Sequence, residues 1–175
     1  MQRSLALAAM LLCQLSAPQA VGASCDATAA QIEVEIRRTG AKAFIEKHFD
    51  QDAWSRVLVG IETAGPRWLA IGESLKPHSD AGSSEELTDA FFSALAVDPL
   101  RTLPVLMRVY KSGPEELCNQ TFEAQLPKQG VEPYLNAIER GLRNPKTKTQ
   151  RSMATACRKG LQASRKFARE NGLLQ

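Results

Sequence analysis

The sequence predicts an all-α fold, organised as a single domain of stacked antiparallel helical hairpins. Three observations predict it. β-branched residues rarely gather into alternating runs, aromatic residues make up only 6% of the chain, and alanine, leucine, glutamate, lysine and arginine are abundant in it. Those five residue types favour helices most strongly. A mature chain of about 150 residues is also long enough to bury a hydrophobic core.

The first 23 residues have the pattern of a secretory signal peptide. A positively charged start ends at Arg3, an apolar run follows to Leu15, and small residues stand at Val21-Gly22-Ala23. A dozen apolar residues suit a signal peptide and fall short of the ~20 that span a membrane. We therefore expect 1–23 to be removed and 24–175 to form one periplasmic or secreted helical domain.

Turn and cap residues divide the first half of this domain into helices. The first covers about 28–39, and the second covers 41–49. Two further helices meet at Gly65-Pro66, where we expect Gly65 to be a left-handed C-cap and Pro66 to open the next helix. Apolar residues at helical spacing define their buried faces: Trp54, Val57, Leu58 and Ile61, then Trp68, Leu69, Ile71 and Leu75.

A polar loop is expected over 78–83, followed by two more helices. Ser83-Ser84-Glu85-Glu86 has the spacing of a capping box, and Asp98-Pro99 repeats a cap followed by proline. Pro104 should kink the second of these helices. The expected buried residues are Leu87, Phe91, Ala94 and Leu95, then Leu103, Leu106, Met107 and Tyr110.

The last third begins with a capping signal over 112–115 and a surface loop at 128–130. A helix then ends at Asn144-Pro145, and Thr147 with Gln150 forms a capping box for the final helix. The two buried faces are Tyr134, Leu135, Ile138 and Leu142, then Met153, Cys157, Gly160, Leu161, Ser164 and Ala168.

The pairs of helices around Gly65-Pro66 and Asp98-Pro99 resemble each other, which raises the alternative of a short α-solenoid. Two copies are too few to establish a repeat, because any antiparallel helix pair favours this loop chemistry.

Export would expose the cysteines to an oxidising compartment. Cys13 leaves with the signal peptide, so three pairings of Cys25, Cys118 and Cys157 are open. We favour a disulfide between Cys118 and Cys157, because both fall in expected helices and Cys25 lies at the mobile end of the mature chain. A lipid anchor on Cys25 is disfavoured, since Gly22 stands where a lipoprotein signal has a large aliphatic residue.

About half of the mature chain resembles a family of small, exported, uncharacterised proteobacterial proteins. The resemblance rests on packing and capping residues: Trp54, Val57, Leu58, Ile61, Gly65-Pro66, Trp68-Leu69, Asp80-Ala81-Gly82, Glu85-Glu86-Leu87, Ala94-Leu95, Pro99 and Leu106. It implies a bacterial, periplasmic setting, and it implies no reaction, cofactor or ligand.

The two histidines are the candidate residues for a catalytic metal site. Both stand in a His-x-Asp pattern, as His48-Phe49-Asp50 and His78-Ser79-Asp80. Two imidazoles and a carboxylate could hold zinc with a position open for water, as in a metal-assisted hydrolase. The simpler interpretation makes Asp50 and Asp80 ordinary turn and helix-start residues. The sequence therefore assigns no catalytic, cofactor or metal residues.

Other catalytic motifs are missing from the sequence. It has no glycine-rich phosphate loop and no G-x-S-x-G. The acidic pairs Glu85-Glu86 and Glu115-Glu116 cannot act together on one substrate, because adjacent helical residues point about 100° apart. Binding is therefore favoured over catalysis.

Charge is divided unevenly along the chain. Residues 140–175 contain ten Lys and Arg against one acid, a net charge of +9, whereas 24–139 contain eleven bases against eighteen acids, a net of −7. Such separation can steer a charged partner over a Debye length of about 8–10 Å. The alternative is that the basic segment packs against the acidic helices of its own domain.

These observations favour an exported interaction module, such as an adaptor, inhibitor or immunity-type protein, whose partner is another envelope or exported protein. The alternatives are the His48/His78 hydrolase and attachment to anionic envelope surfaces through the basic C-terminal helix. Nucleic acid is not an expected partner, because the basic segment has one aromatic residue, Phe167, for base stacking.

Overall fold

The computed structural model describes residues 20–122 and 126–174, with side chains from residue 28 onward. This part of the chain is all-α, as the sequence predicts, with no strand among the described residues. The helices are α1 (Ala20–Thr39), α2 (Ala41–His48), α3 (Asp52–Glu62), α4 (Pro66–Leu75), the 3-10 helix η1 (Lys76–His78), α5 (Ala81–Val97), α6 (Pro99–Tyr110), α7 (Pro114–Leu117), α8 (Val131–Gly141) and α9 (Lys148–Glu170).

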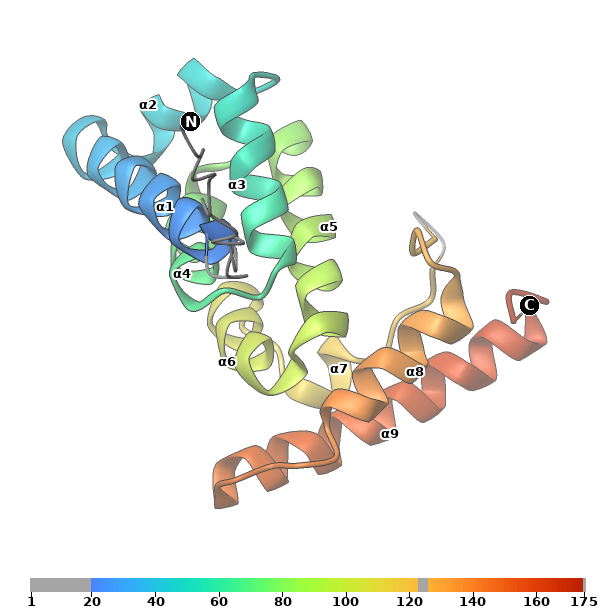
Figure 1. The fold of residues 1–175 in the computed structure, drawn as a ribbon. Helices are drawn as coiled ribbons and strands as arrows, with labels where there is room; N and C mark the ends of the chain where they lie inside the picture. The colour runs from blue at the N-terminus through green and yellow to red at the C-terminus, as the bar shows by residue number, and fades with distance from the viewer. Residues whose placement is uncertain (1–19, 123–125, 175) are drawn as a thin grey trace, which may run out of the picture.

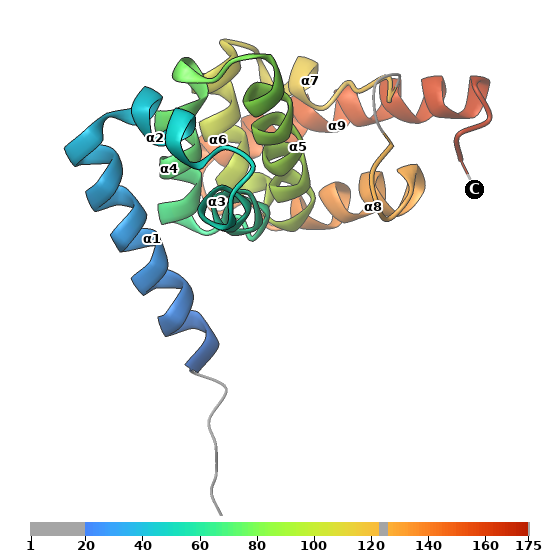
Figure 2. The same ribbon diagram turned by 90° about the horizontal axis from the view of Figure 1, so that it is seen from above.

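The long helix α5 connects the two parts of the molecule (Figure 1). On one side it packs against α3 and α6, which with α1, α2 and α4 form a body. On the other side it contacts α8, which pairs with α9 in an arm that extends away from the body. Figure 2 shows the N-terminal half of α1 projecting from the body and the α8–α9 arm at the opposite end.

The core contains most of the apolar faces that helical periodicity predicts. Trp54, Val57 and Ile61 of α3 are buried, as are all the residues expected on α4, α5, α8 and α9. The exceptions are half-buried: Leu58 on α3, and Met107 and Tyr110 on α6. Leu58 packs against the edge of the core and also lines the space between the body and the arm.

The start of α5 differs from the expected one. The N-cap is Asp80, whose carboxylate accepts hydrogen bonds from the backbone N–H of Ser83 at 3.3 Å and from its hydroxyl at 2.7 Å. The Ser83 Oγ accepts the Asp80 N–H at 3.0 Å, which completes a capping box. Ser83 is therefore the third residue of the helix and not its cap. The expected loop over 78–83 shortens to Ser79 and Asp80.

The turn between α3 and α4 also differs from the expected one. The left-handed residue is Ala64, with φ 55°, whereas Gly65 is an extended N-cap with φ −63°. The carbonyl of Ala64 accepts a hydrogen bond from the Arg101 guanidinium at 3.1 Å, and its methyl group is fully buried. Contacts within the body thus hold an alanine in a conformation that usually favours glycine. Pro66 opens α4 as expected.

Helix α7 lies directly against α9, where three residues of α9 share one buried face. Cys157 forms a disulfide with Cys118 across a Cα–Cα distance of 5.2 Å, which supports the expected pairing. One turn later, a Cβ on Gly160 would lie 2.1 Å from the Glu115 carbonyl oxygen. One turn further along, the Ser164 hydroxyl accepts a hydrogen bond from the Gln120 backbone N–H and donates one to the Cys118 carbonyl. Only glycine at 160 permits this close approach.

The capping signals of the last third have different outcomes. Thr147 and Gln150 form the expected capping box of α9. Ser112 does not cap α7, since Gly113 is the N-cap and the Ser112 hydroxyl donates to the Tyr110 carbonyl at 3.4 Å.

The expected signal peptide lies outside the described residues except for 20–23, which begin α1. Helix α1 starts about two turns earlier than expected, because the alanine-rich stretch before residue 28 favours a helix. Cys25 therefore has a helical backbone where a mobile end was expected. The pairs α3–α4 and α5–α6 each pack together, but the solenoid-like stacking of hairpins is not confirmed and stays a prediction.

Candidate interaction surfaces

The described residues do not gather into a metal site. No group of three or more His, Cys, Asp and Glu side chains in this part of the chain could hold a metal ion. His48 ends α2, and its Nε2 lies 2.9 Å from Glu35 Oε1. Asp80 caps α5, as the simpler interpretation of His78-Ser79-Asp80 expects. No observation therefore favours the hydrolase.

His48 belongs to a small ionic cluster that joins α1 to α2. Its ring packs on Phe44 with 4.6 Å between ring centres, and Lys47 Nζ also donates to Glu35 at 2.7 Å. These hydrogen bonds from His48 and Lys47 lower the pKa of Glu35 to about 2. The first histidine thus contributes to the packing of two helices.

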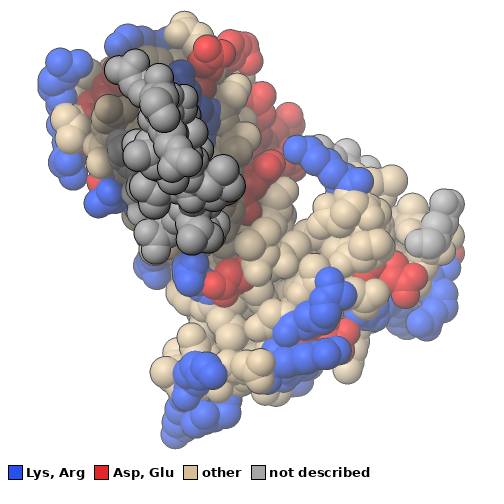
Figure 3. All heavy atoms as spheres, in the orientation of Figure 1, with Lys and Arg blue, Asp and Glu red and all other residues tan. Residues whose placement is uncertain are grey.

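Basic side chains gather around the loop that joins α8 to α9, shown at the lower left of Figure 3. We call Arg140, Arg143, Lys146, Lys148 and Arg151 the basic tip. All five are exposed, and none forms a side-chain ion pair with a described residue. The first turn of α9 contains no acidic residue, although a helix N-terminus is electrostatically suited to one. Lys148 and Arg151 thus oppose the dipole at the start of α9, whereas Arg140 complements the dipole at the end of α8.

One ion pair of the C-terminal segment joins α9 to α8, and another lies within α9. Arg165 binds Glu139 at 2.7 Å, and Lys166 lies 3.9 Å from Glu170. No ion pair between the described residues joins α9 to the acidic residues of α3 or α5, which gather on another side of the molecule (Figure 3). The basic segment 140–175 and the acidic segment 24–139 therefore meet in the Arg165–Glu139 pair, and the alternative of internal charge matching stays a prediction.

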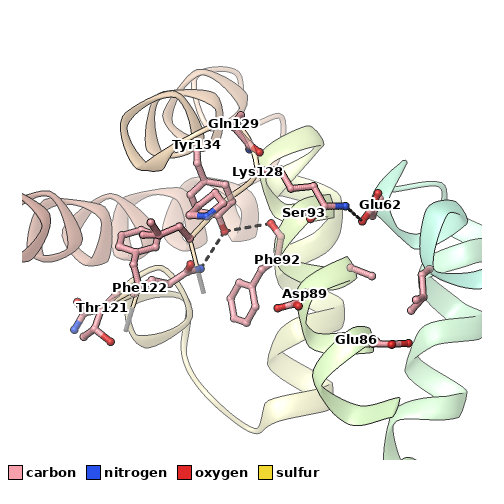
Figure 4. A pocket seen from close by; sticks show the side chains of 16 residues that line it. Glu62, Glu86, Asp89, Phe92, Ser93, Thr121, Phe122, Lys128, Gln129 and Tyr134 are labelled. Carbon is pink, nitrogen blue, oxygen red and sulfur yellow. Dashed lines mark hydrogen bonds and ion pairs between the residues drawn. The ribbon is translucent and has the colours of Figure 1, made fainter. Parts of the chain in front are cut away.

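A cleft of about 560 Å³ lies between the body and the arm (Figure 4). Its volume is within the range of ligand sites in proteins. Described residues of α3, α5, α8 and the segments on either side of 123–125 line it: Leu58, Glu62, Glu86, Asp89, Ala90, Phe92, Ser93, Asn119, Gln120, Thr121, Phe122, Leu126, Pro127, Lys128, Gln129 and Tyr134.

One wall of the cleft is acidic. Glu86, Asp89 and Phe92 lie three residues apart on α5 and share one side of the helix. The buried indole of Trp54 donates a hydrogen bond from Nε1 to Glu86 Oε2, which fixes the position of this carboxylate. Glu62 of α3 extends the wall and pairs with Lys128 at 3.5 Å across the cleft.

The opposite wall is aromatic. The Phe122 and Tyr134 rings meet edge to face with 6.1 Å between centres. The Tyr134 hydroxyl donates to the Phe92 carbonyl at 3.2 Å and accepts from the Gln120 side chain at 3.1 Å. Burial raises the pKa of Tyr134, so this hydroxyl stays protonated at neutral pH. The wall is thus held to both α5 and the segment after the disulfide.

Sequence reasoning did not find this cleft. The sequence predicts Leu58 and Tyr134 on buried helix faces, which the structure confirms for Tyr134, and it predicts Glu86 in a capping box and Lys128 in a surface loop. The one available signal was the i, i+3, i+6 spacing of Glu86, Asp89 and Phe92, which places polar and aromatic side chains on the same side of α5.

Comparisons of the chain with protein families, curated proteins and solved structures gave no match.

Proposed function

We propose that the chain is an exported, non-catalytic interaction module, of the adaptor, inhibitor or immunity type, that binds an acidic surface of another envelope or exported protein. The observation that carries the proposal is the basic tip, five exposed cations without ion pairs among the described residues. Unpaired like charges beside a helix N-terminus oppose folding, and an acidic partner would relieve this repulsion and associate faster through steering.

Export is part of the proposal, and two features support it. The first 23 residues have the composition of a signal peptide, and a disulfide such as Cys118–Cys157 persists in an oxidising compartment. No helix among the described residues is both long and apolar enough to cross a bilayer.

A protein partner is favoured over an anionic membrane because of how α9 packs. A membrane-surface helix buries its apolar face among lipids, whereas Met153, Leu161 and Ala168 of α9 are buried within the protein. The large apolar side chains that are exposed among the described residues lie outside the α8–α9 loop and α9: Val34, Val59, Val97 and Leu126.

Affinity capture from the envelope fraction, under non-reducing conditions, tests this function. The mature chain should retain a partner that moderate salt elutes, because exposed charge pairs are screened. A triple variant, Arg143→Gln/Lys146→Gln/Arg151→Gln, should lose that partner. Equal capture by the variant and the native chain would contradict the proposal, as would salt-sensitive binding to anionic vesicles in place of a protein.

The matched control neutralises three exposed cations at the other end of the molecule. Arg37→Gln/Arg38→Gln/Lys42→Gln removes the same charge from α1 and α2. The control should keep the partner. If it loses the partner as the tip variant does, net charge and not the basic tip determines binding, and the proposal fails.

A further inference from the structure

We propose that the cleft between the body and the arm binds a cationic segment of a partner protein, with an arginine or lysine side chain between its acidic and aromatic walls. This site is separate from the basic tip, and the inference does not depend on the function proposed above.

Charge and shape together define the occupant. Three carboxylates, those of Glu62, Glu86 and Asp89, face a cleft in which Lys128 is the one cation among the described lining residues. Across from them lie Phe122 and Tyr134, and Phe92 lies next to Asp89 on α5 (Figure 4). A guanidinium or ammonium group is attracted both to carboxylates and to aromatic faces, whereas the acidic wall would repel an anion and would not attract an uncharged apolar ligand.

The chain already places one cation against this wall. The Lys128 side chain is 83% exposed, yet its Nζ reaches across the opening to Glu62 at 3.5 Å. An exposed pair of this kind contributes about 0–1 kcal/mol. An incoming cation can therefore displace Lys128 at little cost, and Lys128 acts as an internal competitor at the mouth of the cleft.

The acidic wall is also preorganised. Glu86 is held by the Trp54 indole, and Trp54 is 1% exposed within the core of the body. On the aromatic side, the Tyr134 hydroxyl is fixed at two hydrogen bonds. Groups that are already held in place lose little conformational freedom on binding. The cleft is larger than one side chain, and we therefore assign it to a peptide segment and not to a small organic cation.

Fluorescence anisotropy with labelled peptides tests the inference. The probes are a short peptide in which arginine and alanine alternate and its counterpart with glutamate in place of arginine. The arginine peptide should bind, and the glutamate peptide should not. Glu86→Gln and Asp89→Asn should each weaken binding about threefold or more, and Phe122→Leu should do the same through the lost aromatic face.

Lys128→Gln gives the sharpest outcome, because it should strengthen binding of the arginine peptide about two- to threefold by removing the competitor. If the Lys128–Glu62 pair has only a structural role, Lys128→Gln should bind the peptide more weakly or not at all.

Glu132→Gln and Lys42→Gln are matched controls outside the cleft and should leave affinity unchanged. Thermal unfolding of each variant checks that it is folded. The amide oxygen introduced by Glu86→Gln can still accept the Trp54 hydrogen bond.

Three results would overturn the inference. The first is equal binding of both peptides, and the second is loss of affinity in Lys128→Gln while that variant remains folded. The third is a different occupant. Spermidine that competes as strongly as the peptide would indicate a polyamine site, and self-association of the chain that Glu86→Gln abolishes would indicate a second copy. Variants of the basic tip should not change peptide binding, so failure here leaves the proposed function untouched.

Discussion

The Ser164 hydroxyl accepts the backbone N–H of Gln120 at 2.6 Å, which ties the middle of α9 to the chain beyond the disulfide. The same hydroxyl donates to the Cys118 carbonyl at 3.0 Å and is fully buried. The Gln120 side chain in turn holds Tyr134 in the aromatic wall of the cleft. Through Gln120, the buried Ser164 of α9 therefore helps to hold the aromatic wall of the cleft in place.

Ser164→Ala should destabilise the fold by about 1–3 kcal/mol, because it leaves the Gln120 N–H without its partner. Chemical denaturation measures the change. Ser152→Ala, at an exposed position of the same helix, is the control and should stay within about 0.5 kcal/mol of the native chain. Equal effects of the two variants would show that the hydrogen bond does not contribute.

Gly160→Ala should also destabilise the protein, although alanine favours a helix by about 1 kcal/mol over glycine. The added methyl group would lie 2.1 Å from the Glu115 carbonyl, so α7 must move away from α9. Overpacking of this kind costs about 1–3 kcal/mol. Gly113→Ala is the control, since a Cβ there meets nothing within 4 Å. A higher melting temperature for Gly160→Ala would contradict the close approach.

Removal of the disulfide should lower the free energy of unfolding by about 4 kcal/mol, as chain entropy predicts for a loop of this length. Cys118 and Cys157 are 39 residues apart. The Cys118→Ala/Cys157→Ala variant and the native chain are compared by urea denaturation. Thiol labelling of a chain that begins at residue 24 checks the pairing: one cysteine, Cys25, should react before reduction and three after it.

Lys148→Glu should change stability and partner binding in opposite directions. Lys148 is the first residue of α9, where a carboxylate stabilises the helix dipole by about 0.3–1 kcal/mol. The same substitution reverses a charge of the basic tip and should weaken capture of the acidic partner. Melting temperature and capture are measured on one preparation. A variant that melts higher and captures the partner as well as the native chain does contradicts a binding role for the tip.

Stability should decrease in acid partly through Glu35. Its pKa is about 2 in the folded chain against 4.5 for an ordinary glutamate, so the unfolded chain binds its proton first as the pH falls. The stabilisation by Glu35 is complete above pH 4.5 and is lost progressively toward pH 2. Glu35→Gln should flatten this part of the curve of unfolding free energy against pH. An unchanged slope would show that the contacts to His48 and Lys47 do not hold in solution.

The buried faces of the helices could be predicted because they depend on local periodicity. Leu87, Phe91, Ala94 and Leu95 repeat at helical spacing, and all four are buried. The box at Thr147 and Gln150 could also be predicted, because both of its members lie within one turn.

Local rules failed where two patterns competed. Ser83 precedes Glu86 by three residues, but Asp80 also precedes Ser83 by three, and the sequence alone does not decide between these two boxes. At the α3–α4 turn, contact with Arg101 from α6 accompanies the left-handed conformation of Ala64. A residue so far along the chain cannot enter a prediction made from the turn itself.

The cleft could not be predicted for the same reason. Its walls bring Leu58 of α3 and Glu86 of α5 opposite Tyr134 of α8. Each of these residues has an ordinary explanation within its own helix. Their common role depends on the angle between body and arm, which helix periodicity does not contain.

The covalent loop closed by Cys118 and Cys157 contains the aromatic wall at Phe122 and Tyr134, all of α8, and all of the basic tip. A protease that cuts the exposed turn at Lys128 would therefore leave both fragments joined. Such a nicked molecule would keep its mass until a reductant separates the pieces. In a compartment rich in proteases, the disulfide therefore keeps the two fragments in one molecule after a single cleavage of this loop.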